Sequence, residues 1–241
     1  IPVHSKEFGR IATQNAKNLI LQKIREEERK VVFDQYFEKE KDIVTGVVQR
    51  YVGKNISINL GRADAMLTEN EQVKGEEFEP TERIKVYILE VKDTPKGPRI
   101  LLSRTHPGLV KRLFESEVAE VKDGTVEIKS IAREAGSRTK IAVWSNDPDV
   151  DPVGACVGMN GARVNSIVEE LRGEKINIIN WDENPAILIE NALSPAKVIA
   201  VMADPDEKTA LVVVPDYQLS LAIGKEGQNA RLAARLTRFK I

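Results

Sequence analysis

The sequence predicts an α+β protein of several domains, in which one long helix and a small five-stranded β-barrel precede two copies of a mixed helix-and-strand module. Three patterns support this prediction. Apolar residues recur at steps of three and four up to about residue 40, at steps of two between residues 42 and 104, and in a mixed order after residue 106. Within the mixed region one pattern returns 66 residues later, so that Gly158 matches Gly224. We therefore divide the chain into residues 1–40, 41–105, 106–181 and 182–241.

The composition is that of a folded protein from a reducing compartment. Of the 241 residues, 41% are hydrophobic and 30% are charged, a normal balance for a globular chain. No apolar run approaches the roughly 18 residues that a membrane helix needs, so we expect a cytoplasmic protein without membrane contact. The single cysteine, Cys156, has only His4 and His106 as companions, which excludes a disulfide framework and a Cys/His zinc site. We expect no metal and no cofactor.

The charge balance gives no support to a broad nucleic-acid surface. Lys and Arg total 36 against 37 Asp and Glu, which leaves a net charge of −1. The basic excess that often marks nucleic-acid-binding proteins is therefore absent. A nucleic acid would have to be held at a few local contacts.

The first segment is expected to form one amphipathic helix from Arg10 to about Glu40, because it contains no Pro and no Gly. Charged residues lie between its apolar positions, which favours a solvated connector helix. Because the chain starts at Ile1 rather than Met, we expect a fragment whose preceding part has been removed. The apolar positions are Ala12, Ala16, Leu19, Ile20 and Ile24.

The second segment alternates apolar and polar residues, as expected for short strands. The strands are expected at residues 43–48, 55–60, 65–67, 84–91 and 100–103, with turn-rich or acidic sequences between them. Five such strands suggest a small closed barrel of the OB type. The segment also resembles the RNA-binding barrel first named in a ribosomal small-subunit protein. However, Ile56 and Ala65 stand where strong RNA binders carry stacking aromatics, so an RNA contact by the barrel is left open.

The third segment is expected to begin with a helix and to continue through two strands, two helices and a last strand. These elements are placed at Leu109–Val121, Thr125–Ala132, Thr139–Ser145, Val153–Val157, Ala162–Arg172 and Lys175–Trp181. The fourth segment is a more compact copy. Its elements are placed at Ala196–Ala203, Thr209–Val214, Gln218–Ile223, Gln228–Thr237 and Phe239–Ile241. Only Asp182–Pro185 separates the copies, which is too short for a free tether, so we expect the two modules to be fixed relative to one another.

Both copies place a G-x-x-G sequence between two helices, at Gly158 to Gly161 and at Gly224 to Gly227. Two glycines three residues apart let the backbone turn sharply without Cβ atoms, so a phosphodiester chain can lie directly on the loop. The N–H groups at the start of the next helix then face the phosphates, with the positive end of the helix dipole behind them. One such sequence is weak evidence, but two in the same setting are strong evidence for a phosphate-backbone clamp.

This order of elements resembles the bacterial, type II form of the KH module, an RNA-binding unit. Residues 103–109 (SRTHPGL), 149–158 (DVDPVGACVG) and 219–232 (LSLAIGKEGQNARL) are, more specifically, similar to the NusA family of bacterial transcription factors. The likeness covers nearly the whole chain. It implies binding of single-stranded nascent RNA and an effect on pausing, termination and antitermination. It also implies association with bacterial RNA polymerase, mainly through a preceding N-terminal domain, and with other antitermination factors.

The resemblance and the loop chemistry together predict the RNA-binding residues. KH loops commonly carry a basic residue between the glycines, and the second loop has Lys225, whereas the first has Met159 and Asn160. Arg163, one turn further on, is a partial substitute, and Arg231 shares a helix face with Arg235. The predicted set is Gly158, Met159, Asn160, Gly161, Arg163, Gly224, Lys225, Glu226, Gly227, Gln228, Asn229 and Arg231. Val157, Ile178 and Ile223 are either core residues or the floor of a groove for bases.

No catalytic residue is predicted, and we expect a binding protein rather than an enzyme. The acidic run from Asp147 to Asp151 lacks the glycine and the glutamate of a calcium loop, and Cys156 is interpreted as a small buried residue. Two alternatives stay open: an RNA-binding module of an RNA-degradation or ribosome-associated protein, and a protein–protein adaptor. We expect one continuous RNA track with about four nucleotides per module.

Overall fold

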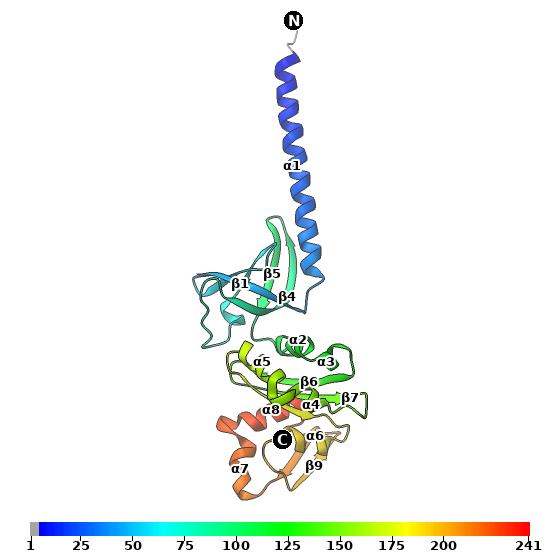
Figure 1. The fold of residues 1–241 in the computed structure, drawn as a ribbon. Coiled ribbons are helices and arrows are strands. Elements are labelled where there is room, and N and C mark those ends of the chain that lie inside the picture. The colour runs from blue at the N-terminus through cyan, green and yellow to red at the C-terminus, as the bar shows by residue number, and fades with distance from the viewer. Residues whose placement is uncertain (1–4) are drawn as a thin grey trace.

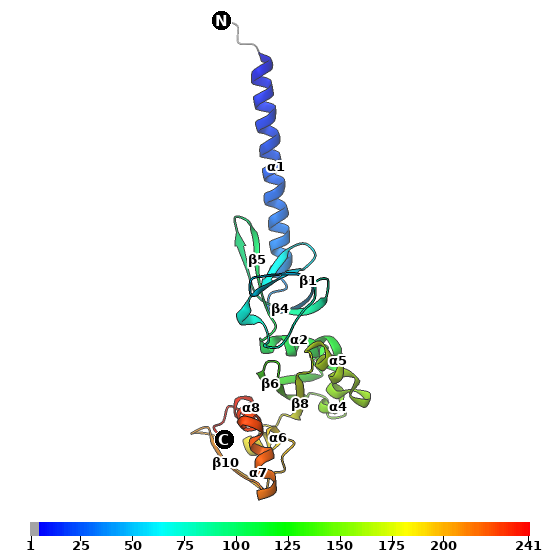
Figure 2. The same cartoon turned by 90° about the vertical axis from the view of Figure 1, so that its left-hand side faces the viewer.

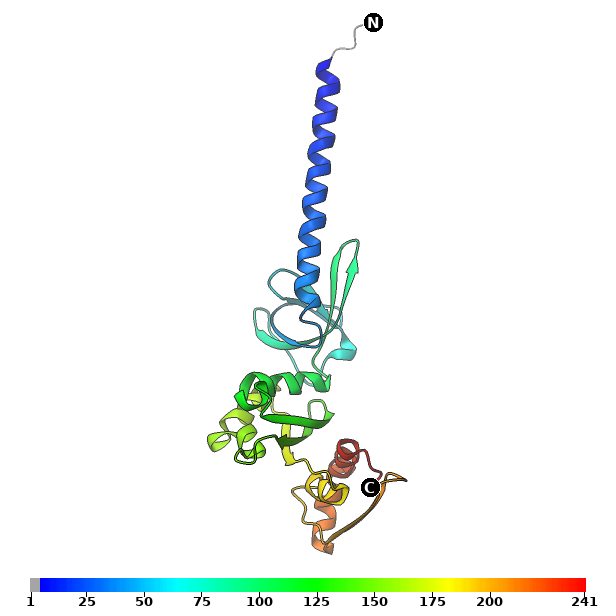
Figure 3. The same cartoon turned by 90° about the vertical axis from the view of Figure 1, so that its right-hand side faces the viewer.

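The computed structural model describes residues 5–241 and shows four units that follow one another along the molecule (Figure 1). A long helix leads to a β-barrel, the first mixed module follows the barrel, and the second lies beyond it. The same order is visible from the two other sides (Figure 2 and Figure 3). Within the described range, a search for helices that could span a membrane finds none.

Helix α1 (Ser5–Phe37) contacts the barrel through its C-terminal third. Tyr36 is buried in the barrel core together with the partly buried Val32 and Phe33, and its hydroxyl donates a hydrogen bond to the carbonyl of Leu60 at 2.9 Å. The remainder of the helix points away from the other units in every view. The expected long helix is confirmed, although it ends at Phe37 rather than near Glu40.

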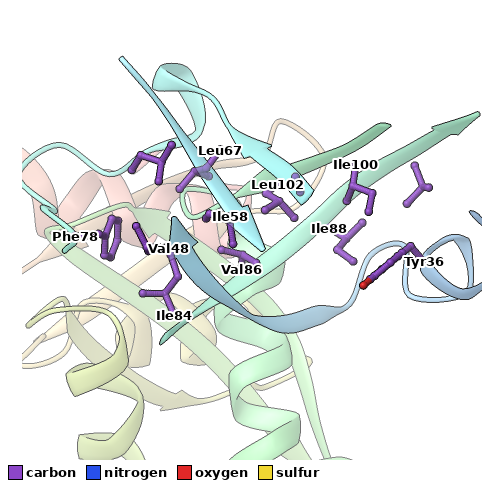
Figure 4. Close-up of a cluster of buried hydrophobic side chains, with 13 residues drawn as sticks. Tyr36, Val48, Ile58, Leu67, Phe78, Ile84, Val86, Ile88, Ile100 and Leu102 are labelled. Carbon is purple, nitrogen blue, oxygen red and sulfur yellow. The ribbon is translucent and has the colours of Figure 1, made fainter. Parts of the chain in front are cut away.

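Five strands close into a barrel in the order β1-β2-β3-β5-β4. Their bounds are β1 Ile43–Val52, β2 Asn55–Asn59, β3 Asp64–Leu67, β4 Arg83–Thr94 and β5 Gly97–Ser103. The pairing of β3 with β5 is parallel, while the other neighbours are antiparallel. Alternate side chains point inward, as Ile56 and Ile58 do from β2, and form the core shown in Figure 4. The expected five-stranded barrel is confirmed.

The acidic connection between β3 and β4 covers part of the barrel instead of lying free in solvent. It starts with a turn of 3₁₀ helix at Glu69–Glu71. Its apolar residues Val73 and Phe78 are buried, and Phe78 belongs to the barrel core (Figure 4). The connection therefore contributes to the packing of the barrel. Its acidic sequence does not indicate this burial.

The first module packs helices on one face of a three-stranded sheet ordered β6-β7-β8. Its elements are α2 Pro107–Glu117, α3 Ala119–Lys122, β6 Val126–Glu134, β7 Arg138–Ser145, α4 Pro152–Val157, α5 Ala162–Glu170 and β8 Lys175–Asn180. Strands β6 and β7 are antiparallel, and β8 runs parallel to β7. The single helix expected over Leu109–Val121 is wrong, because the chain breaks at Val118. That residue has an extended backbone (φ −114°, ψ 108°) and a buried side chain.

The second module repeats this plan in smaller form. Its elements are α6 Pro185–Ala192, β9 Ala200–Asp204, β10 Thr209–Val213, α7 Asp216–Ile223 and α8 Gln228–Thr237. A parallel bridge joins Thr209 to Lys240, in the place where a third strand is expected. Helix α6 is missing from the sequence prediction, which has no element between Pro185 and Ala196. A signal was present: Asn184 caps the helix by accepting a hydrogen bond from the N–H of Ala186 at 3.0 Å, just before Pro185.

The side chain of Arg104 ties the barrel to the first module. It is fully buried, and its Nη2 and Nε donate hydrogen bonds to the carboxylate of Glu76 at 2.6 and 3.1 Å. Its Nη1 donates to the carbonyl of Lys85 at 2.8 Å and to the carboxylate of Glu170, on α5, at 3.1 Å. Burial by itself lowers the pKa of Arg104, but the hydrogen bonds and charges of Glu76 and Glu170 raise it overall. One buried cation thus joins barrel and module.

The two modules share a hydrophobic core. Ile141 and Val143 of β7 point into the first module's own core, whereas the intervening Ala142 points to the opposite face of the sheet. There it packs in a second core with residues of α6 and α8, including Ile189 and Leu232. This shared core supports the expectation that the two modules keep a fixed relative position.

Lys140 lies on the same face of β7 and is buried in this interface. Its Nζ donates hydrogen bonds to the carbonyls of Ala192 and Ser194 at 2.8 and 2.7 Å, at the C-terminal end of α6. Burial lowers the pKa of Lys140 from 10.5 to about 8, and the charge of Arg138 acts in the same direction. The interface therefore contains one titratable group with a strongly shifted pKa.

Replacing Arg104 with Met should strongly destabilise the protein, because the buried carboxylate of Glu76 would lose its partner. Removing one side of a buried ion pair costs about 3–5 kcal/mol, and we expect a loss of this size in the free energy of unfolding measured with urea. Arg99→Met on β5 is the control, since Arg99 is exposed and should cost less than about 0.5 kcal/mol. Equal losses in the two variants would contradict the role given to Arg104.

The contribution of Lys140 should depend on pH. Its pKa is about 8 in the folded protein and 10.5 ordinarily, so between these values the unfolded chain binds more protons than the folded one. The stability that Lys140 contributes therefore rises with pH across this window and is lost as pH falls through it. We expect the difference in unfolding free energy between the wild type and Lys140→Met to increase from about pH 7.5 to about pH 9.5. The exposed Lys175 provides the control: the same increase with Lys175→Met would refute the assignment to Lys140.

Candidate nucleic-acid interface

The first G-x-x-G loop joins α4 to α5 at the surface. Helix α4 ends at Gly158, where φ is 76° and ψ is 175°, a backbone conformation that is essentially restricted to glycine. Gly161 has φ 76° and ψ 12° and starts α5. Between them Met159 is 84% exposed, and Asn160 is exposed as well. The two central side chains are therefore free to meet a ligand that lies on the loop.

The second loop, between α7 and α8, has the same backbone conformation. Gly224 has φ 78° and ψ 171°, and Gly227 has φ 75° and ψ 11°. Glu226 has φ 55° and ψ 26°, against 54° and 26° for its counterpart Asn160. Lys225 and Glu226 are exposed. Two stretches with different central residues thus fold into one clamp geometry.

The first glycine of each loop lies directly on the helix that follows. A Cβ atom at Gly158 would come within 2.8 Å of the Arg163 side chain, and one at Gly224 within 2.7 Å of the backbone nitrogen of Asn229. The second glycines, Gly161 and Gly227, stand at the N-cap positions, where no described side chain caps α5 or α8. The first N–H of each helix already donates within its loop, from Ala162 to the carbonyl of Met159 and from Gln228 to the carbonyl of Lys225, so what the helix start offers an anion is the positive end of its dipole.

Arg163, predicted as a substitute for a basic loop residue, is held by its own module. Its Nη1 donates hydrogen bonds to the carboxylate of Glu120 at 2.8 Å and to the carbonyl of Ala155 at 2.7 Å. Its side chain is one-third exposed. The guanidinium lies beside the first loop, but a carboxylate already neutralises it.

Three predicted residues at the start of α8 have different surroundings. Asn229 is buried, and its Nδ2 donates hydrogen bonds to the carbonyls of Leu193 and Ala222, both at 3.0 Å. Its side chain therefore supports the loop from inside. Gln228 and Arg231 instead reach the first module, where both donate hydrogen bonds to the carboxylate of Glu134.

Glu134 was missed by the sequence prediction. It lies at the end of β6, and its partner Gln228 is 94 residues further along the chain. Nothing in the local pattern around residue 134 signals the contact, because the two positions meet only when α8 packs on the first module's sheet. The second loop is thus tied to the first module by side chains as well as by the shared core.

A groove of about 540 Å³ lies between the two modules. Val153, Ile178 and Ile179 of the first module form its apolar part. The wall from the second module includes Ser194 and Lys197. Ile178, one of the residues considered for the floor of a base-binding groove, therefore lines an open space. Ile223, considered for the same role in the second module, is 46% exposed, whereas Val157 is half-buried.

Cys156 lies inside the first module's core. Burial raises the pKa of its thiol to about 11, so the protonated, non-nucleophilic form prevails at neutral pH. Among residues 9–241, no group of His, Cys, Asp and Glu side chains is arranged to hold a metal ion.

Comparison with known proteins shows which family has this order of domains. The family described as the NusA-like first KH domain matches residues 104–181, the NusA-like second KH domain matches residues 185–241, and the NusA N-terminal domain matches residues 1–30. The transcription termination/antitermination protein NusA of Mycobacterium tuberculosis (strain H37Rv) is 47% identical over 243 residues, which cover 97% of this chain and 70% of that protein. This chain belongs to the NusA family.

NusA proteins of other bacteria have similar levels of identity to this chain. The transcription termination/antitermination protein NusA of Bacillus subtilis is 58% identical over this whole chain and 65% of its own length. That of Thermus thermophilus is 44% identical over this whole chain and 62% of its own length. The chain thus spans a little less than two thirds of these two relatives. A solved structure titled "Crystal structure of APE1850" has a TM-score of 0.39 and 20% identity over 52% of this chain and 86% of that one.

Adding a methyl group to either first glycine of the KH loops should destabilise the protein, because both have a positive φ and a neighbour within 2.8 Å of the new Cβ. A strained backbone of this kind costs on the order of 1–3 kcal/mol. We expect Gly224→Ala to lose more unfolding free energy than Gly158→Ala, since its closest neighbour is backbone rather than a flexible side chain. Gly124 also has a positive φ, but a Cβ atom there would have no neighbour within 4 Å. Gly124→Ala therefore measures the cost of backbone strain without the cost of a close contact. If Gly224→Ala is no worse than Gly124→Ala in urea denaturation, the contact is unimportant.

Proposed function

We propose that this protein holds single-stranded RNA along its two KH domains during transcription in the bacterial cytoplasm, and thereby influences pausing, termination and antitermination by RNA polymerase. One observation carries the proposal: the two G-x-x-G loops have the same backbone conformation and are linked through a shared core. The names of the relatives, transcription termination/antitermination protein NusA, support the wider role.

Each loop would grip the RNA backbone rather than read its sequence. The glycines allow the sugar-phosphate chain to approach, and the positive ends of the α5 and α8 helix dipoles would face the phosphates. Lys225 adds a mobile cation at the second loop. Because these contacts are few, they are compatible with a net charge of −1.

In this proposal the RNA would pass along the groove between the KH domains. Its apolar residues Val153 and Ile178 would pack against bases, and Asn180 and Asn191 would offer hydrogen bonds to their edges. With about four nucleotides per KH domain, the track would take roughly eight or more.

Contact with RNA polymerase would lie on the N-terminal side of the molecule, and the match of residues 1–30 to the NusA N-terminal domain supports this part of the proposal. Residues 1–40 would then connect a polymerase-binding part to the barrel at residues 41–105. Other antitermination factors would join the same assembly. No chemical step is part of this role, and the protein acts as a binder and not as an enzyme.

The proposal predicts that both loops contribute to RNA affinity and that the second contributes at least as much as the first. Met159→Asp with Asn160→Asp adds two negative charges. Lys225→Asp with Glu226→Asp changes the net charge by the same amount, because Lys225 loses one positive charge and gains one negative charge. Each pair should weaken binding of an unstructured RNA by on the order of 1–3 kcal/mol, measured by titration at one salt concentration.

The control is Lys96→Asp in the β4–β5 turn, an exposed position with the same change of net charge. It should leave affinity nearly unchanged, and circular dichroism should show that all variants are folded. An equal loss with Lys96→Asp would mean that only overall charge is being measured. A clearly larger loss at the first loop would make Arg163, and not Lys225, the main basic contact.

A further inference from the structure

Three side chains of α8 converge on one carboxylate of the first KH domain. The Nε of Arg231 donates a hydrogen bond to Glu134 at 2.5 Å, and the Nε2 of Gln228 donates another at 2.9 Å. The guanidinium of Arg235 lies 3.8 Å from the same carboxylate. Glu134 therefore sits at the centre of the donors that flank the second KH loop.

Arg231 also belongs to the loop itself. Its Nη1 donates a hydrogen bond to the carbonyl of Glu226, one of the two central loop residues, at 3.0 Å. The guanidinium thus stands between the loop backbone and Glu134. An RNA phosphate that lies on the loop would approach the same guanidinium, and it presents the same kind of acceptor, a charged oxygen.

The contact with Glu134 is open to solvent. The side chains of Arg231 and Arg235 are 42% and 55% exposed, and that of Glu134 is 21% exposed. Ion pairs of this exposure contribute little to stability. They are consequently able to exchange one anionic partner for another at small cost.

Other contacts also hold the two KH domains together. Leu232, Ala233 and Leu236 of α8 are buried against the sheet of the first domain, and Lys140 joins that sheet to α6. Loss of the Glu134 contact would leave these interactions in place. The Glu134 contact is therefore one of several that join the two domains.

We propose that Glu134 is an internal counter-charge that occupies Arg231 and Gln228 in the RNA-free protein and yields them to an RNA phosphate at the second loop. This inference rests on the proposed RNA-binding function. In this proposal Glu134 sets the affinity for RNA without touching the RNA. Its charge weakens RNA binding and makes log K fall less steeply with log salt.

The test is Glu134→Gln, which keeps the size and the hydrogen-bonding atoms of the side chain but removes the charge. In the wild type the freed carboxylate of Glu134 takes up about one cation as the phosphate releases one, whereas Glu134→Gln takes up none, so the slope of log K against log salt should become steeper by about 0.7 for a single strand. The ratio of the variant's affinity to that of the wild type should therefore be about fivefold larger at 0.1 M salt than at 1 M. Titration of one unstructured RNA, about ten nucleotides long, at several salt concentrations measures both quantities.

Two further variants locate the effect. Glu127→Gln removes an equal charge from the same strand, where Glu127 pairs with Lys129, and should leave the slope unchanged. The double variant Glu134→Gln with Arg231→Gln should bind no better than Arg231→Gln alone. Near-ultraviolet circular dichroism of Trp144 and Trp181, which contact each other edge to face in the first KH domain, reports whether the packing there is retained.

The outcomes are distinct. Tighter binding with a steeper slope in Glu134→Gln, absent from Glu127→Gln, supports the counter-charge. Unchanged or weaker binding in a variant with an unaltered tryptophan spectrum overturns it, as does an equal gain in Glu127→Gln. If the wild-type protein itself fails to bind the RNA, the proposed function falls, and this inference falls with it.

Discussion

The shared core between the two KH domains is the constraint on which the rest of the structure depends. The second domain has a small sheet, and its helices α6 and α8 bury their apolar sides against Ala132, Ala142 and Ile179 of the first. A domain of this size gains much of its stability from such a neighbour. Because this packing sets where α8 begins, it also sets where the second loop lies, which face of α8 meets Glu134, and how the groove between the domains is formed.

Elements with strong local periodicity were predictable from the sequence. The long helix, the alternating barrel strands and the helix Gln228–Thr237 each carry their own pattern. Both loops were predictable because two glycines at fixed positions indicate backbone conformations that other residues rarely adopt. The failures were of another kind. Val118 ends a helix because it is drawn into the core, and Phe78 is buried in an acidic loop, so in both places tertiary packing overrode the local pattern.

The candidate site was predicted at the level of the backbone but not of every side chain. The exposed residues Met159, Asn160, Lys225 and Glu226 stand where the motif places them. Asn229 follows the same motif but turns inward, since a short amide fits against the end of α7. The pairing of Arg231 with Glu134 joins residues 97 positions apart. An arginine suits any carboxylate or phosphate equally well, and only the fold decides which one it meets.

The near identity of the two loop conformations has a consequence for substitutions in the loops. The bend is specified by the glycines and the helices around them, while Met159-Asn160 in one copy and Lys225-Glu226 in the other produce no change in backbone angles. The two central positions of each loop are therefore able to differ between the copies without a change in the backbone bend. Substitutions at these positions therefore change the charge of one loop while the backbone bends of both loops are kept.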